Sequence, residues 1–290
     1  MPARLEAMKL ASFATAGRAS YGVIAGDGLV DLGARLGSHY PTLRAALAGN
    51  ALGEIARTAG AKPDLALAAV NLLPPITSPD KIVCIGLYYR AHAAEAGLKV
   101  PEHPSLFLRL TNTLVPHGGS LVRPSLSSAM DYEGELAVVI GRSGRHIAAA
   151  TALDHIAGYA CFNDGSLRDY QRQHSVTVGK NFVATGGFGP WLVTSDEIPD
   201  PSQLTLTTRL NGTEVQCGET ADMIFSVAQI VSYVSAFTRL EPGDVISTGT
   251  PPGVGMARQP PLWLKPGDVV EVEISRIGVL RNTVVAETRT

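Results

Sequence analysis

The chain has 290 residues and a mass of 30.4 kDa, enough for two domains or for one large core with an appendage. Hydrophobic residues make up 45% of it and charged residues 17%, which excludes a disordered chain. A formal net charge of −2 excludes a strongly basic nucleic-acid or anionic-membrane binder, so a small-molecule ligand is expected, with no nucleic acid and no membrane as partner.

The N-terminal residues are expected to form a small unit of their own. Residues 21–31 read as two short strands around a glycine turn, and helical patterns follow near 43–47 and 52–58. The proline-rich segment 73–79 reads as a linker, because proline disrupts helices and removes a strand donor. We therefore expect a small N-terminal domain over 1–74 and a larger domain over 75–290.

The larger unit reads as strand-rich. An apolar run at 136–140 and alternating patterns at 204–210 and 269–274 predict strands, whereas apolar spacing over 227–240 predicts one helix. Strands and helices do not alternate regularly, which argues against a doubly wound nucleotide-binding fold. The expected class is mixed α+β, mostly β.

Targeting and redox features are few. The longest uncharged apolar stretch, 223–238, is interrupted by polar residues and is shorter than the roughly 20 residues of a membrane span. The first residues contain no apolar signal core. Cys84, Cys161 and Cys217 stand far apart without CxxC spacing and are expected to be buried free thiols. These features predict a cytoplasmic protein.

An acidic motif stands directly before the apolar run at 136–140. In a strand, residues two apart share a face, so Glu133 and Glu135 would present two carboxylates together. They could belong to a solvated edge strand. If they enter the core, they need a cation or a proton, and Mg²⁺, Mn²⁺ or Ca²⁺ suits oxygen ligands. Asp164, which follows the apolar run 159–162, is either a third ligand or an ordinary turn residue.

Two further patterns carry possible chemistry. Residues 88–97 read as a short helix in which His92 and Glu95 are three apart, so they form either a general base with its orienting carboxylate or a surface pair. Arg168 and Gln171 would share a helical face. The glycine-rich segments 186–190 and 249–255 are either loops that approach a ligand or simple turns.

Taken together and in order, the motifs between about Lys81 and Val285 resemble those of the fumarylacetoacetate hydrolase superfamily. The segments that carry this resemblance are Tyr89-x-x-His92-x-x-Glu95, Asp131-x-Glu133-x-Glu135-Leu136, Asn163-Asp164-x-Ser166-x-Arg168-Asp169-x-Gln171, Gly179-Lys180, Asn211-Gly212, Gln216 and Pro242-Gly243-Asp244-Val245-Ile246-x-Thr248-Gly249-Thr250-Pro251.

The resemblance implies a β-roll catalytic domain, a homodimer, and Mg²⁺ (or Mn²⁺ or Ca²⁺) held by Glu133, Glu135 and Asp164. It implies a catalytic group consisting of His92, Glu95 and Lys180. The residues implied to bind substrate are Arg109, Arg168, Gln171 and Thr250. Arg109 stands where many members have lysine, and this change concerns the substrate and not the metal.

The reaction implied is hydrolysis of a C–C bond in a β-diketone acid, such as an acylpyruvate, fumarylpyruvate or fumarylacetoacetate, in aromatic catabolism. Water activated by His92 and Glu95 would attack, and the metal would stabilise an enolate. The alternatives are an isomerase, tautomerase or decarboxylase of a related keto acid on the same scaffold. A more distant alternative is a metal-stabilised binding protein without catalysis.

Overall fold

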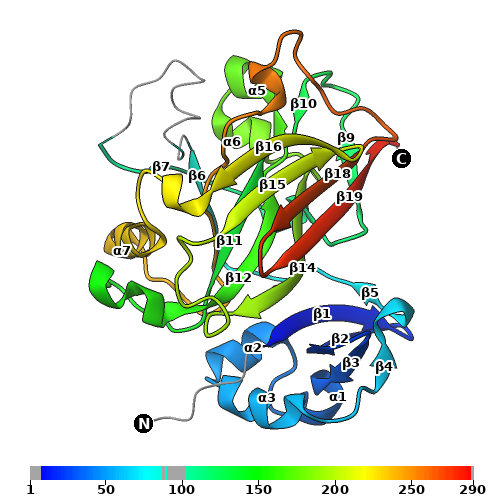
Figure 1. The fold of residues 1–290 in the computed structure, drawn as a ribbon, viewed down its shortest axis with the longest axis vertical. Helices are drawn as coiled ribbons and strands as arrows, with labels where there is room; N and C mark the ends of the chain where they lie inside the picture. Colours follow the sequence, from blue (N-terminus) through cyan, green and yellow to red (C-terminus); the bar gives the residue numbers. More distant parts are fainter. Residues whose placement is uncertain (1–7, 87–88, 90–101, 289–290) are drawn as a thin grey trace.

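The computed structural model describes residues 8–86, 89 and 102–288 (Figure 1). It is a mostly-β structure with short helices, which confirms the expected fold class. Within the described residues, the largest sheet has twelve strands. Its main path runs β4 (Leu65–Ala66), β3 (Gly28–Asp31), β2 (Arg18–Ala25), β1 (Lys9–Thr15), β14 (Gly186–Thr194), β12 (Ile156–Asn163), β11 (Gly134–Ile140), β17 (Val245–Ser247), β6 (Ile82–Gly86) and β7 (Ser105–Leu108).

Smaller strands and a second sheet complete the β structure. Strand β5 (Asn71–Leu72) pairs with β1, and β8 (Leu114–Val115) pairs with β14. The second sheet runs β16 (Thr213–Glu219), β15 (Thr205–Leu210), β18 (Val269–Ile274), β19 (Gly278–Ala286) and β9 (Ser120–Arg123). A two-stranded ladder joins β10 (Met130–Asp131) to β13 (Ser166–Leu167). The predicted strands at 136–140, 204–210 and 269–274 are therefore confirmed.

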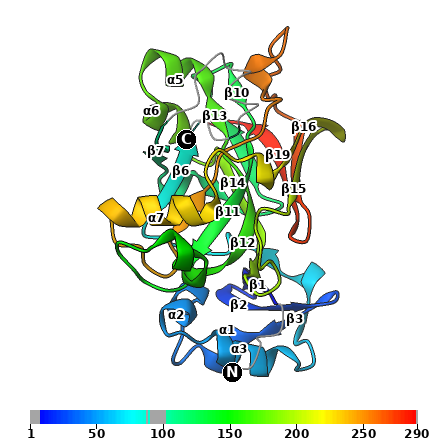
Figure 2. The ribbon, with the colours of Figure 1, turned by 60° about the vertical axis from the view of Figure 1, so that its left-hand side comes forward.

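Within the described ranges, the α-helices are short. They are α1 (Leu32–Leu36), α2 (Leu43–Ala48), α3 (Leu52–Ala59), α5 (Arg168–Gln173), α6 (Val176–Lys180) and α7 (Val227–Phe237). Helix α7 begins with a capping box in which Ser226 and Gln229 satisfy each other's backbone N–H groups, and it confirms the helix predicted there. Figure 2 shows α5 and α6 at one end of the molecule and the N-terminal strands and helices at the other.

Strand β11 separates two hydrophobic cores. Leu136, Val138 and Ile140 lie in a core that includes residues of α7, β15 and β18. Ala137 and Val139, which point the other way, lie in a core with residues of α2 and α3. All seven residues of β11 are buried, because both faces and both edges are covered, and this explains the unbroken apolar run in the sequence.

The N-terminal elements agree with the sequence analysis. Strands β2 and β3 form the expected pair, and α2 and α3 stand where helices were predicted. Strand β1, which the sequence pattern did not reveal, pairs with β14 and so continues the main sheet into the N-terminal part. The boundary at residue 74 stays a prediction.

Two expectations are wrong. Residues 186–190 lie in buried strand β14 and not in a loop or turn. Glycine stands at position 186 because a Cβ there would lie 2.6 Å from Arg109 Nη2, so its absence makes room for that buried side chain. Cys84 and Cys161 are buried as expected, but Cys217, on edge strand β16, is exposed. In the described part of the chain, every helix is too short or too polar to cross a bilayer.

Candidate metal centre

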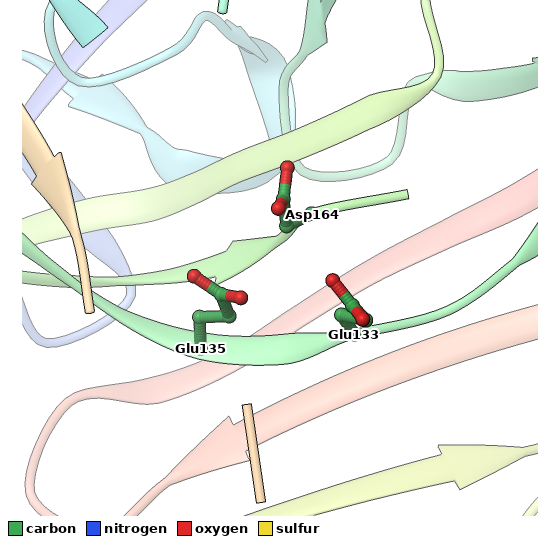
Figure 3. A group of neighbouring side chains, drawn as sticks. All are labelled: Glu133, Glu135 and Asp164. Atoms are coloured by element: carbon green, nitrogen blue, oxygen red, sulfur yellow. The ribbon is translucent and has the colours of Figure 1, made fainter. Parts of the chain in front are cut away.

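Three carboxylates meet where β11 begins and β12 ends. These strands are antiparallel, and Gly134 pairs with Asn163. Glu133 and Glu135 flank Gly134, and Asp164 follows Asn163, so the register brings all three acids together. Their ligand oxygens lie within 4.8 Å of one another, and Figure 3 shows the three side chains directed toward a common point. All three are buried, so the solvated edge-strand alternative does not apply.

Backbone and amide contacts lock this register. The Glu133 N–H donates to Asn163 Oδ1 at 3.0 Å, and the Asp164 N–H donates to the Glu133 carbonyl at 2.8 Å. The Gly134 N–H donates to Gln216 Oε1 at 3.0 Å. Position 134 must be glycine, because a Cβ there would lie 2.1 Å from Thr208 Oγ1. The acids are therefore held by fixed main-chain geometry.

Glu135 is buried beside two other acids. Its Oε2 accepts hydrogen bonds from Ser247 Oγ and from the Gly249 N–H, the latter at 2.9 Å. Burial, together with the negative charges of Asp164 and Glu133, nevertheless raises the pKa of Glu135 well above its ordinary value. The site around Glu135 therefore favours a proton or a further cation.

Lys180 lies between two of the acids. Its Nζ donates to Glu133 Oε2 and Asp164 Oδ2, and to the Asp164 carbonyl at 3.1 Å. Burial opposes the charged form, but the carboxylates of Asp164 and Glu133 outweigh it and raise the pKa of Lys180. Lys180 is thus held as an ammonium ion beside the cavity, and its catalytic role stays a prediction.

Arg168 is committed to two acids. Its Nη2 donates to Glu133 Oε1 at 2.6 Å and its Nε to Asp131 Oδ2 at 2.8 Å. Its Nη1 donates to Gln171 Oε1 at 3.0 Å, which confirms that Arg168 and Gln171 share a face of α5. This side chain therefore has a structural partner at each nitrogen.

Arg109 supports the third acid. Its buried guanidinium donates to Asp164 Oδ1 at 2.5 Å, to the Gly165 carbonyl at 3.0 Å and to Thr185 Oγ1 at 3.0 Å. Arg109 does not appear among the described residues that line the adjacent cavity. Its contact with substrate stays a prediction. Its contact with Asp164, a predicted metal ligand, is direct, so the expectation that position 109 does not concern the metal is wrong.

A cavity of about 290 Å³ opens onto the carboxylates. It brings together the three acids, Lys180 and three of the predicted substrate-binding residues, and Thr250 is fixed by donating to the Gly134 carbonyl at 2.8 Å. His92 and Glu95 lie outside the described residues. The described lining consists of Ile85, Gly86, Ser105, Phe107, Glu133, Glu135, Asp164, Arg168, Gln171, Arg172, Val176, Lys180, Thr250 and Met256.

The donor set fits a hard divalent cation. Carboxylate oxygens are the ligands preferred by Mg²⁺, Mn²⁺ and Ca²⁺. Among the residues that the structure describes, the cluster holds four acids, including Asp131, against three paired cations, so one negative charge is in excess there when all are ionised. The raised pKa of Glu135, caused first by burial and then by its acidic neighbours, marks the position of that excess.

Several supporting residues were not predicted from the sequence. Asp131 accepts from Arg168, from the Gly255 N–H at 2.7 Å and from the Met256 N–H at 3.1 Å, and so joins the cavity wall to the acidic motif. Its only sequence signal is its place two residues before Glu133. Ser247 gave no signal, and the motif that contains Gly249 gave none of its contact with Glu135, because both residues reach Glu135 only through the pairing of β17 with β11.

Comparison with known proteins identifies the family. Residues 81–285 match the family model described as fumarylacetoacetate (FAA) hydrolase C-terminal. The human oxaloacetate tautomerase FAHD2A, mitochondrial, is 43% identical over 226 residues, which cover 77% of this chain and 72% of that protein.

Two solved structures are similar over nearly the whole chain. The first is 2-hydroxyhepta-2,4-diene-1,7-dioate isomerase from Mycobacterium marinum, with 31% identity, a TM-score of 0.77, and coverage of 97% of this chain and 100% of that one. The second is maleylpyruvate hydrolase from Sphingobium sp. SYK-6 in complex with manganese (II) ion and pyruvate, with 27% identity, a TM-score of 0.82 and the same coverage. The chain therefore belongs to the fumarylacetoacetate hydrolase family, and its relatives include a tautomerase, an isomerase and a hydrolase.

Proposed function

We propose that this member of the fumarylacetoacetate hydrolase family is a divalent-metal-dependent enzyme that interconverts the keto and enol forms of a 2-oxo acid of the oxaloacetate type. The observation that carries the proposal is the meeting of three buried carboxylates and the Lys180 ammonium at one cavity. The 43% identity to a protein named oxaloacetate tautomerase supports this choice of reaction.

Glu133, Glu135 and Asp164 would hold the metal. A divalent cation bound there supplies Lewis-acid stabilisation of negative charge on the oxygens of a keto acid. Ser247 and the Gly249 N–H keep Glu135 oriented, Arg168 does so for Glu133, and Arg109 for Asp164. These contacts fix the acids before substrate arrives, as preorganised catalysis requires.

Tautomerisation moves one proton between carbon 3 and the carbonyl oxygen of the keto acid. Lys180 keeps its proton, and its positive charge at the cavity would stabilise the oxygen that becomes negative between the two forms. His92, oriented by Glu95, is the proposed base that takes the proton from one atom and returns it to the other. Gln171 and Thr250 line the cavity and would position the substrate.

The test is the rate of ketonisation of enol-oxaloacetate, followed by loss of ultraviolet absorbance. We expect acceleration with Mn²⁺ or Mg²⁺, loss of activity in EDTA, and recovery on adding metal. Lys180→Met is expected to lower kcat roughly 10²- to 10³-fold, the usual effect of removing one preorganised group that stabilises a developing oxyanion. If the wild-type protein with either metal ketonises enol-oxaloacetate no faster than the same solution without enzyme, the proposal is refuted.

Hydrolysis of a C–C bond is the second candidate, and the likeness to the maleylpyruvate hydrolase structure favours it. Hydrolysis consumes water, whereas tautomerisation does not. A panel of acylpyruvates, fumarylpyruvate and oxaloacetate in ¹⁸O water therefore separates the two reactions. Label in a newly formed carboxylate identifies hydrolysis, and His92→Ala should abolish that label if His92 activates the water.

Four properties implied by the family resemblance stay predictions: magnesium as the native metal, a homodimer, a role in aromatic catabolism and a cytoplasmic location. Light scattering coupled to size-exclusion chromatography tests the dimer. Metal analysis of protein purified without added metal tests whether magnesium is the native metal.

A further inference from the structure

We infer that Arg172 is the specificity-determining residue of this site, and that it binds the second carboxylate of a dicarboxylic 2-oxo acid. The inference rests on the proposed function, because it takes the carboxylate cluster as the place where the 2-oxo-acid end of the substrate binds. It adds the chemical class of the other end of the substrate and the side chain that recognises it.

The three buried cations of the site have partners already. Lys180 contacts Glu133 and Asp164, Arg168 contacts Asp131 and Glu133, and Arg109 contacts Asp164. Releasing any of them to bind a substrate would leave a buried carboxylate unpaired, which costs several kcal/mol in general. The buried cations are thus poorly suited to read a second anionic group.

Arg172 differs from these three cations in its exposure and in its contacts. It lines the same cavity and is exposed, and it makes no hydrogen bond or ion pair with any residue in the described part of the chain. Binding a carboxylate there breaks no existing contact. A guanidinium also presents paired donors that match a carboxylate in a two-pronged contact.

The helix sets the distance between the two ends of the substrate. Arg168 and Arg172 are four residues apart on α5, so they lie on one face with a rise of about 6 Å between them along the axis. Arg168 contacts the acidic cluster through Glu133, and Arg172 therefore stands about one helical turn from it. This spacing suits a short dicarboxylate, whose two acidic ends are separated by a few carbon atoms.

The rest of the lining near this end favours a compact substrate. Val176 and Met256 line the same cavity as Arg172 and supply apolar surface to it. A total volume of about 290 Å³ accommodates a small diacid. We therefore assign to the cavity a keto diacid whose 2-oxo-acid end faces the carboxylate cluster and whose distal carboxylate faces Arg172.

The experiment compares oxaloacetate with its 4-methyl ester, which keeps the 2-oxo acid but lacks the distal charge. The wild-type protein should favour oxaloacetate, and Arg172→Gln should lower kcat/KM for oxaloacetate roughly tenfold to a hundredfold, the usual effect of losing one charged hydrogen bond. The value for the ester should stay unchanged. Arg172→Lys, which keeps the charge without the fork, should keep part of the preference.

A matched control is Arg57→Gln, which removes an exposed arginine from α3, remote from the cavity. It should leave both substrates unaffected. Equal losses for acid and ester in Arg172→Gln, or no loss for either, would overturn the role assigned to Arg172.

Binding gives a readout that does not depend on turnover. Calorimetric titration with 3,3-difluoro-oxaloacetate, which cannot enolise, should show the same tenfold to hundredfold weakening in Arg172→Gln. If the wild-type protein binds this diacid through Arg172 but does not accelerate tautomerisation, the proposed reaction is wrong and the recognition stands. If tautomerisation is fast and Arg172→Gln changes neither kcat/KM nor the affinity for the difluoro diacid, the role assigned to Arg172 is wrong and the proposed reaction stands.

Discussion

Replacing Glu135 by glutamine should change stability in opposite directions with and without metal. Glutamine has nearly the same shape, and its carbonyl oxygen can still accept from Ser247 and from the Gly249 N–H. The substitution removes a buried negative charge from beside Glu133 and Asp164. In EDTA the variant should therefore be at least as stable as the wild-type protein.

The size of this effect follows from the spacing of the oxygens. Two unit charges 4.8 Å apart repel by roughly 3 kcal/mol at an effective dielectric constant of about 20. Closer pairs of oxygens repel more strongly, but Lys180 offsets part of this repulsion and proton uptake by Glu135 relieves more of it, so the net effect of the substitution should be smaller than the repulsion of one pair. We expect a gain of about 1–2 kcal/mol, or roughly 2–8 °C in Tm, for the metal-free variant.

With metal bound, the wild-type protein should be more stable than the Glu135→Gln variant. At a metal concentration of 100 times Kd, binding stabilises the wild-type protein by about 2.7 kcal/mol. If loss of one ligand weakens the metal about a hundredfold, the same concentration adds only about 0.4 kcal/mol to the variant. Differential scanning calorimetry with EDTA and with Mn²⁺ measures both terms.

The matched control is Glu219→Gln, which removes an exposed carboxylate on β16. It should leave the metal-dependent shift in Tm intact. An equal shift in the Glu135 variant and in the wild-type protein, together with a lower Tm in EDTA, would contradict the assignment of Glu135 as a ligand.

Two further perturbations test the surroundings of the site and the N-terminal part. Gly186→Ala places a Cβ 2.6 Å from Arg109 Nη2, so it should cost about 1–3 kcal/mol in a urea titration and weaken metal binding by displacing the partner of Asp164. At Asp31, burial raises the carboxyl pKa, but hydrogen bonds from Ser20 and Arg18 outweigh it and hold that pKa below its ordinary value of 3.8. This contribution to stability is present above the ordinary pKa of 3.8 and is lost as the pH falls through the lowered value, so Asp31→Asn should flatten the dependence of unfolding free energy on pH below that ordinary pKa.

Each of these variants has a control in the N-terminal part. At Gly53 on α3, a Cβ would meet only Arg57 Nη1 at 4.0 Å, so Gly53→Ala should be neutral or slightly stabilising. Asp27→Asn changes an exposed acid and should leave the acid limb of the unfolding profile as it is in the wild-type protein. A Gly186→Ala variant as stable as Gly53→Ala, or a pH profile unaffected by Asp31→Asn, would contradict the packing and linkage described above.

Local patterns in the sequence were sufficient for the central elements. The run 136–140, the alternation at 269–274 and the helical spacing from Val227 each report the surroundings of a single element, and all three elements form as predicted. Glu133 and Glu135 could be placed together because the spacing within a strand fixes the side of each residue. The meeting of these acids with Asp164 followed from the family resemblance and is seen in the register of β11 and β12.

Long-range pairing explains what the sequence did not reveal. Ser247 reaches Glu135 across 112 positions, and β1 joins β14 although more than 170 residues separate them in the chain. The glycines of β14 resemble a loop in the sequence. The structural requirement for glycine at position 186 comes from the guanidinium of Arg109, which is distant in the chain and therefore not visible in the local pattern. Likewise, composition alone could not show that Arg168 is paired whereas Arg172 has no partner in the described part of the chain.

The antiparallel register of β11 and β12 has a consequence for engineering this scaffold. The carboxylates sit at the open end of the hairpin, while residues 141–155 connect the two strands at the opposite end. New termini or an inserted domain placed in that connection should leave the acids in place. Adding a single residue inside either strand would instead turn the following side chains to the opposite face and dismantle the centre.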